Sequence, residues 1–225
     1  MSDQNNHPDT PNIPSSSAVL AIQSSILIDA PIQDVWSALT DTSTYPKWNR
    51  FVPRVTIREQ PGSNNADDTA LKAETRFTFH VNMYPEAADK PQPELSSLRD
   101  TFLEIIEFEP PTTSTTDTEA DVEADSGALS TGKTKRKGRI VWASDPAANG
   151  ALSSLLTAER VHEVSEVIDE NGKQMTEVRN WESQVGYLAY VVKWMFGGRL
   201  RGNFAHWQAG LKGYMEGREG STSRA

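Results

Sequence analysis

The segment LAYVVKWMFGGRLRGNFAHWQAGLKGY (residues 188–214) decides the fold, because its large apolar residues recur every three or four positions. That spacing places them on one face of a long helix. The pair Gly197–Gly198 interrupts the segment at roughly 1 kcal/mol per glycine relative to alanine, so we expect a break or a close contact there. Such a helix needs a partner layer over its apolar face. The apolar positions are Leu188, Val192, Met195, Phe196, Leu200, Phe204, Trp207, Leu211 and Tyr214.

The residues before this helix predict the partner layer as a set of strands. Residues 20–28 and 76–83 alternate with a period of two, which is typical of a half-buried strand. A short helix is predicted after Ala30–Pro31, because proline is tolerated in a first helical turn. The other predicted strands are joined by turns, which favours antiparallel neighbours. They cover residues 51–58, 100–109, 138–144, 158–169 and 174–185.

This order of elements predicts an α+β fold in which a curved antiparallel sheet wraps around the long C-terminal helix. A sheet that curls around one helix usually leaves a cavity between the two, so we expect a binding cavity there. Three polar segments contain too little apolar surface to offset the entropy of ordering them. We therefore expect a single domain over residues 18–217, with disordered tails at 1–17 and 218–225 and a disordered polar insert at 111–135.

Composition excludes several classes of function. The 225 residues carry 22 basic and 31 acidic side chains, and a net charge of −9 argues against binding nucleic acid. The chain has no cysteine, and its four histidines (7, 80, 162 and 206) lack close ligand spacing, so neither a metal nor another cofactor is expected. No stretch approaches ~18 apolar residues, so no transmembrane segment is predicted. The start of the chain does not resemble a secretory signal, and we expect a cytoplasmic protein.

Several segments, taken in order, form a recognisable set. They are ILIDAPIQDVWSALTD (residues 26–41) with YPKWN (45–49), then FEPP (108–111), ERVHEV (159–164) and residues 176–182 with Gly186. The first two resemble the opening, and the others the later strands, of the SRPBCC or START-like superfamily, which includes the polyketide cyclase/dehydrases and has the Bet v 1-like helix-grip fold. The resemblance covers about residues 18–217. It implies an apolar pocket for a small ligand, in a superfamily that contains both lipid carriers and aromatase/cyclases.

The hairpin between the last two predicted strands has two registers. A two-residue turn at Asn171–Gly172 would place His162 and Glu182 on opposite faces. A three-residue loop over 170–172 would instead pair Arg160 with Glu182 and His162 with Asn180. The second register fits the family pattern and is the one we predict. It places a polar cluster of Arg160, His162, Asn180 and Glu182 in an otherwise apolar cavity.

These residues lead to three functional hypotheses. The first is binding or carriage of a small hydrophobic molecule, with the polar cluster orienting the polar end of the ligand. The second is an aromatase/cyclase or dehydratase acting on a polyketide-like substrate, with Glu182, His162 or Arg160 assisting proton transfer. The third is a protein-interaction module with a vestigial pocket. Apolar stripes at strand or helix spacing more often belong to the core, but they also supply candidates for ligand contact. These candidates are Phe77, Phe79, Trp142, Met195, Phe204 and Trp207.

Overall fold

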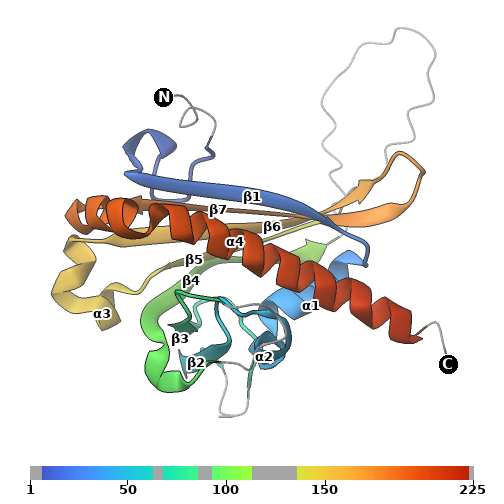
Figure 1. Cartoon of the computed structure of the whole chain (residues 1–225), viewed down its shortest axis with the longest axis horizontal. Coiled ribbons are helices and arrows are strands. Elements are labelled where there is room, and N and C mark those ends of the chain that lie inside the picture. The colour runs from blue at the N-terminus through green and yellow to red at the C-terminus, as the bar shows by residue number, and fades with distance from the viewer. Residues whose placement is uncertain (1–6, 63–67, 86–92, 113–135, 223–225) are drawn as a thin grey trace, which may run out of the picture.

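A computed structural model describes residues 7–62, 68–85, 93–112 and 136–222 of the chain. A seven-stranded antiparallel sheet has the order β1-β7-β6-β5-β4-β3-β2, and the long helix α4 lies along one of its faces (Figure 1). The strands are β1 (Leu20–Ile28), β2 (Arg54–Glu59), β3 (Arg76–Val81), β4 (Arg99–Thr112), β5 (Lys137–Ser144), β6 (Thr157–Ile168) and β7 (Gln174–Val185). The helices are α1 (Ile32–Thr40), α2 (Tyr45–Trp48), α3 (Pro146–Asn149) and α4 (Tyr187–Thr222), with 3-10 turns η1 (Ser15–Ser17), η2 (Thr42–Thr44), η3 (Leu95–Ser97) and η4 (Gly150–Ser154).

This architecture confirms the predicted α+β fold. The core forms where the sheet, α1 and α4 meet, because each of them turns an apolar face inward. Phe77 and Ile140 of the sheet are fully buried, as is Val35 of α1, and Leu211 of α4 closes the core from the other side. The second strand begins at Arg54 rather than at Phe51, and the buried side chains of Phe51 and Val52 precede it.

Helix α4 is continuous through Gly197–Gly198, so the expected break is absent. Gly197 is buried, and a Cβ at this position would lie 3.9 Å from Leu20 of β1, an ordinary packing distance. The helix also continues to Thr222, beyond residue 217 where the sequence analysis ended the domain. Its apolar face outweighs the low helix propensity of the glycines, because most helical stability in proteins comes from tertiary packing.

The β6–β7 hairpin has the predicted register. Arg160 pairs with Glu182 and His162 pairs with Asn180, and the same offset holds along both strands. Gly172 has a φ of 82°, which a non-glycine residue adopts only at a cost, and its N–H donates to the carbonyl of Asp169. This glycine allows the three-residue loop and therefore sets which side chains of the hairpin face the interior.

The N-terminal segment corrects one expectation. Residues 7–17 were expected to belong to a disordered tail, yet they pack against the sheet. Ile13 is buried, the Trp181 Nε1–H donates to the Asp9 carbonyl (3.1 Å), and Asn12 donates from its backbone and its side chain to Glu159 (3.0 and 2.7 Å). The polar composition of the segment misled the prediction, because its partners are side chains on the outward face of β6 and β7.

The predicted polar insert lies mostly outside the described residues, which leave out 113–135. Its first two residues, Pro111 and Thr112, belong to β4 instead. The carbonyl of Pro111 accepts a hydrogen bond from Gln33 of α1 (2.8 Å). The strand therefore continues beyond the Glu109 end that its sequence pattern indicated.

Candidate ligand-binding cavity

A cavity of about 710 Å³ lies between the inward face of the sheet, η4 and the first half of α4. It forms because the strands curve away from the helix while inward side chains line the space that remains. Its size is within the range of sites for small organic molecules. Most of its wall is apolar or aromatic: Phe51, Val52, Phe79, Val81, Met83, Phe102, Leu103, Trp142, Leu152, Leu156, Ala158, Leu188, Val192, Phe196 and Leu200.

One polar cluster, formed by Arg160, Glu182 and Gln184, lies in the wall of this cavity. The Arg160 Nε–H donates to Glu182 Oε2 (2.7 Å), and Arg160 Nη2 contacts the same oxygen. The Gln184 side-chain amide donates to Glu182 Oε1. The pair is cross-strand, so the hairpin register brings it together. The side chains of Arg160 and Glu182 are only 13% and 7% exposed, so water screens their charges weakly.

Aromatic rings support the buried guanidinium of Arg160. Its Cζ lies 4.2 Å from the ring centroid of Phe204 and 5.7 Å from that of Phe51. Such cation–π contacts offset part of the desolvation cost of burying a charge. Phe204 itself is buried and does not line the cavity. It therefore acts on the site by holding Arg160 in place.

His162 lies deeper, behind the wall of the cavity. Its ring centroid is 4.1 Å from that of Trp142 and 5.0 Å from that of Trp207. Neither of its ring nitrogens has a hydrogen-bond partner among the described residues. Burial, and then the positive charge of Arg160, lower the pKa of His162 well below its usual 6.5. The imidazole is therefore neutral and part of the aromatic core.

The other predicted site residues separate into two groups. Phe79 and Trp142 line the cavity together with Arg160 and Glu182. The rest do not line it. Asn180 accepts hydrogen bonds from Ser24 and Gln208, and Met195 is 55% exposed on the outer side of α4. The remaining two, Phe77 and Trp207, are buried in the core.

Several residues that line the cavity were not predicted from the sequence, among them Gln184, Leu152 and Leu156. Gln184 lies two residues after Glu182 on the same strand face, so the period of two already contained this signal. Its Oε1 is buried with no hydrogen-bond partner in the described part of the chain, and it borders the cavity. Leu152 and Leu156 come from η4 and the connection after it, where no periodic pattern marks them.

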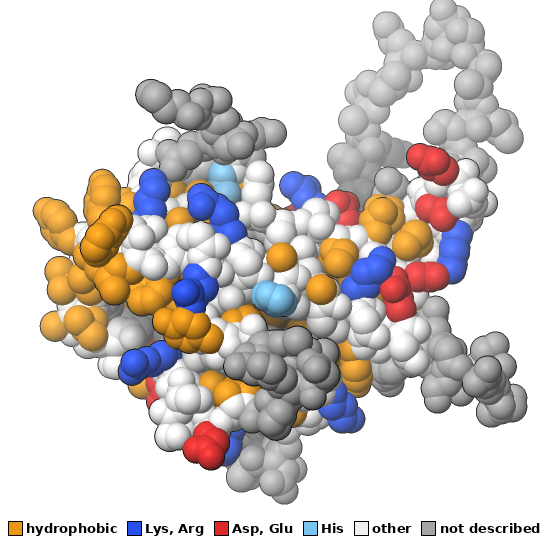
Figure 2. Space-filling view, viewed as in Figure 1, with side chains coloured by type: hydrophobic (Ala, Val, Ile, Leu, Met, Phe, Trp, Pro, Cys, Tyr) orange, Lys and Arg blue, Asp and Glu red, His pale blue; other side chains and the backbone are white. Residues whose placement is uncertain are grey.

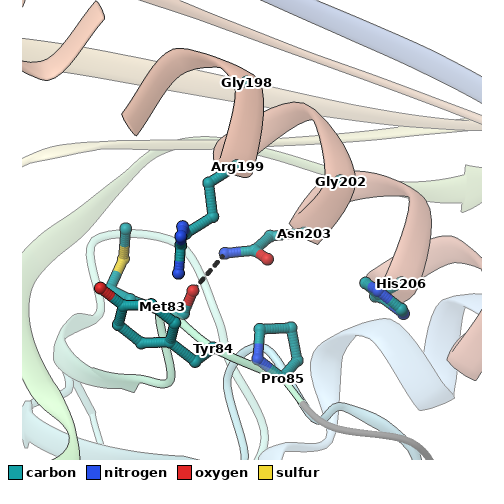
Figure 3. Close-up of a pocket in the computed structure, with 8 residues that line it drawn as sticks. All are labelled: Met83, Tyr84, Pro85, Gly198, Arg199, Gly202, Asn203 and His206. Atoms are coloured by element: carbon teal, nitrogen blue, oxygen red, sulfur yellow. Dashed lines mark hydrogen bonds between the residues drawn. The ribbon is translucent and has the colours of Figure 1, made fainter. Parts of the chain in front are cut away.

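A second hollow, of about 540 Å³, lies between α4 and the segment Met83, Tyr84 and Pro85 (Figure 3). Gly198 and Gly202 line it from α4, and the guanidinium of Arg199 stacks 3.9 Å from the ring centroid of Tyr84. Asn203 donates to the Met83 carbonyl at 3.5 Å, so this amide joins α4 to the end of β3. Arg199 and Asn203 thus already have partners in this hollow, and the larger cavity is the better candidate for a ligand.

Among residues 7–62, 68–85, 93–112 and 136–222, no group of three His, Cys, Asp or Glu side chains is arranged to hold a metal ion. Within the same ranges, no helix is both long and apolar enough to cross a bilayer.

Comparison with known proteins identifies the family. The sequence profile described as "Polyketide cyclase / dehydrase and lipid transport" matches residues 20–201. The chain belongs to this family. A relative, oxopyrrolidines biosynthesis cluster protein O of Penicillium oxalicum (strain 114-2 / CGMCC 5302), is 37% identical over 191 residues, which cover 84% of this chain and 82% of that protein.

Two solved structures superpose on this polyketide cyclase/dehydrase family member to different extents. A hypothetical protein from Helicobacter pylori superposes with a TM-score of 0.56 at 14% identity, covering 96% of this chain and 99% of the other. The di-domain ARO/CYC StfQ from the steffimycin biosynthetic pathway superposes with a TM-score of 0.45 at 10% identity, over 91% of this chain and 53% of StfQ. At these identities the first comparison supports the helix-grip architecture alone.

Proposed function

We propose that the chain binds or carries a small, largely apolar molecule in the cavity beneath α4. One observation carries the proposal: an apolar cavity of about 710 Å³ whose wall contains the buried cluster of Arg160, Glu182 and Gln184. Burying roughly 300 Å² of ligand surface at about 25 cal/mol per Å² would contribute on the order of 7.5 kcal/mol before ordering costs. Micromolar binding needs about 8.2 kcal/mol, so polar contacts must add to apolar burial.

Arg160 is the side chain that supports a preference for an anionic or carbonyl-bearing ligand. A guanidinium has five N–H donors, and the contacts with Glu182 involve only those on Nε and Nη2. The Nη1 donors are then the ones to meet an oxygen of the ligand. Because the cluster is nearly dry, a charged hydrogen bond there contributes more than at the protein surface.

The test compares two fluorescent probes of nearly the same shape. 1-Anilinonaphthalene-8-sulfonate carries one negative charge, and N-phenyl-1-naphthylamine carries none. We expect the unmodified chain to bind both probes, and Leu156→Trp, which fills the cavity from its wall, to weaken both at least tenfold. The control, Leu27→Trp, changes an exposed residue of β1 and should leave both affinities unchanged.

A double variant then tests the role of the charge. Arg160→Met combined with Glu182→Met removes both members of the ion pair, so neither charge is left buried alone. We expect roughly tenfold weaker binding of the anionic probe, about 1.4 kcal/mol, and little change for the neutral probe. Equal losses for both probes would refute the proposed role of Arg160. Unchanged binding to Leu156→Trp would place the site elsewhere, and no binding by the parent would favour the interaction module.

A second candidate function is catalysis of the aromatase/cyclase or dehydratase type. It is favoured by a carboxylate, Glu182, in the cavity wall, and by the relative that is named as a product of a biosynthesis cluster. In this proposal the Glu182 carboxylate takes a proton from the carbon next to a carbonyl. The C–H electron pair forms the C=C bond of an enolate, the π pair of the C=O bond moves onto the oxygen, and Arg160 stabilises that oxyanion.

Hydrogen–deuterium exchange separates the two candidates. 2-Acetonaphthone is an apolar methyl ketone, and proton NMR in D₂O reports how fast its methyl protons exchange. A catalyst should accelerate this exchange, and Glu182→Gln should abolish the acceleration while the neutral probe still binds. Binding of the ketone without faster exchange in the parent would contradict the enzyme proposal and leave carriage.

A further inference from the structure

Large apolar side chains are exposed at one end of the molecule, where η4 meets the first turns of α4. Trp194 is 85% exposed, Tyr187 81% and Tyr190 64%. Figure 2 shows hydrophobic side chains gathered at the end where Figure 1 places α3 and the start of α4. We call this surface the aromatic patch; it consists of Leu152, Leu155, Tyr187, Tyr190, Val191, Trp194 and Met195.

The two segments that form the aromatic patch are adjacent. The Leu188 N–H donates to the Leu155 carbonyl (2.9 Å), and Gly186 packs so closely there that a Cβ would lie 2.3 Å from the same oxygen. The positive φ of Gly186, 99°, lets the chain turn from β7 into α4 at this contact. The exposed rings are therefore carried on a joined helix and loop rather than on a free terminus.

The charge around the aromatic patch is opposite in sign to that of the whole chain. Residues 146–158 contain no charged side chain, and residues 186–215 contain no acidic one. The basic residues Lys193, Arg199 and Arg201 of α4 are exposed, and none of them is paired with an acidic side chain in the described part of the chain. The Lys193 ammonium donates one hydrogen bond to the Val19 carbonyl (2.8 Å) and keeps two further donors. The chain has 31 acidic side chains and a net charge of −9, and none of those acidic side chains lies in residues 146–158 or 186–215.

We propose that the aromatic patch docks on an anionic phospholipid surface. Trp and Tyr have apolar bodies with one polar atom, which suits the boundary between headgroups and acyl chains. Lys193 and Arg201 then reach lipid phosphates, whereas Arg199 is directed toward Tyr84 (Figure 3). A lipid surface accepts protruding rings without any preformed pocket. A protein partner would have to provide a complementary pocket for each ring.

The aromatic patch and the cavity lie on opposite sides of the same turns of α4. Leu152 belongs to both surfaces, and Leu188, Val192 and Phe196 line the cavity from the same turns of α4 that expose Tyr187, Tyr190 and Trp194. A docked chain therefore has one wall of the cavity against the lipid. This consequence rests on the proposed function, whereas the docking itself does not.

Vesicle co-sedimentation tests the docking with the full chain free of ligand. We expect binding to phosphatidylcholine vesicles containing 30% phosphatidylserine, and at least tenfold weaker binding to phosphatidylcholine alone. Tyr187→Ser with Trp194→Ser should lose at least tenfold. Lys193→Gln with Arg201→Gln should lose about fivefold per charge, the equivalent of about 1 kcal/mol each.

A matched control removes the same kind of side chain elsewhere. Leu27→Ser with Ile168→Ser changes two exposed apolar residues, 45% and 46% exposed, outside the patch and should bind vesicles like the parent. Absence of binding to anionic vesicles by the parent overturns the proposal. So does a dimer in analytical ultracentrifugation that the patch variant abolishes, because the patch would then join two copies.

The two naphthalene probes keep this result separate from the proposed function. The patch variant should bind both probes as the parent does, because Tyr187 and Trp194 do not line the cavity. Loss of vesicle binding with retained probe binding supports docking alone. Vesicle binding by a parent that binds neither probe would refute the cavity function and leave the docking intact.

Discussion

At the scale of single residues, His162 combines full burial with two ring nitrogens that have no partner in the described chain. Its lowered pKa determines the direction in which the free energy of unfolding changes with pH. The unfolded chain takes up a proton near pH 6.5, while the folded chain does not until a much lower pH. Unfolding is therefore favoured as the pH falls below 6.5, and the contribution of this residue to stability is fully present above that pH.

We expect His162 to account for about 1.4 kcal/mol of lost stability between pH 7.5 and pH 5.5. His162→Phe keeps an aromatic ring between Trp142 and Trp207 and removes the titrating group. Urea unfolding at the two pH values should show a smaller loss for this variant than for the parent. His206→Gln, which changes an exposed histidine of α4, serves as the control and should keep the parental loss. An unchanged pH response in His162→Phe would contradict the account.

Arg160 and Glu182 show how the neighbourhood of a residue determines its role. Both lie on a strand face predicted from the period of two, and the same face carries His162 and Asn180. Only the first pair borders the cavity, because Trp142 and Trp207 cover His162 and Gln208 reaches Asn180. The alternation of residues along a strand predicts which face of the sheet a side chain lies on. The side chains around it determine whether it borders the cavity.

At the scale of elements, α4 approaches α2 more closely than any side chain on Gly210 would allow. A Cβ at Gly210 would lie 2.3 Å from the carbonyl oxygen of Trp48, which is a backbone atom and cannot rotate away. In an unpacked helix, replacement of glycine by alanine stabilises by roughly 1 kcal/mol. Here the helix must shift instead, and the packing between Trp48 and Trp207, whose ring centroids are 5.6 Å apart, moves with it.

We therefore expect Gly210→Ala to destabilise the fold by about 1–3 kcal/mol. Gly213→Ala, three residues further along the same helix, meets nothing within 4 Å and should be neutral or stabilise by up to about 1 kcal/mol. Urea midpoints of the two variants measure the difference in sign. Equal effects of the two substitutions would show that the close approach of Trp48 is not the reason for a glycine at position 210.

At the scale of the whole molecule, the N-terminal segment extends the fold onto the outer face of the sheet. Val141, Val161 and Trp181 form a small buried cluster there, separate from the main core. The Trp181 indole is held by the Asp9 carbonyl, and the buried carboxylate of Glu159 by Asn12. Removing residues 1–17 would leave these polar groups without their partners, which costs about 1–3 kcal/mol for each buried group.

We expect deletion of residues 1–17 to lower the free energy of unfolding by about 3 kcal/mol or more. Asn12→Ala in the full chain should cost about 1 kcal/mol, because its backbone N–H still reaches Glu159. Ser16→Ala, an exposed change in the same segment, should have little effect. Chemical denaturation of the three proteins gives the comparison. A deletion variant as stable as the parent would show that the segment contributes nothing.

Local pattern in the sequence was sufficient for the strands, for α1 and α4, for antiparallel pairing and for the α+β architecture. The apolar period of residues 188–214, the alternation in the strands and the glycine of the last hairpin each act within a few residues, so they can be read without a structure. The hairpin register follows from the same local rules once the turn type is chosen.

Contacts between distant segments decided the rest, because they depend on surfaces that meet only in the folded chain. The cavity exists where α4 and η4 fail to fill the curved sheet, and no local pattern encodes that volume. Whether Asn12 is ordered depends on a carboxylate at Glu159, 147 positions away. The strands, α1, α4 and their inward faces therefore follow from local sequence. Which inward residues border the cavity, and which apolar residues of α4 stay exposed, depends on surfaces that meet only in the folded chain.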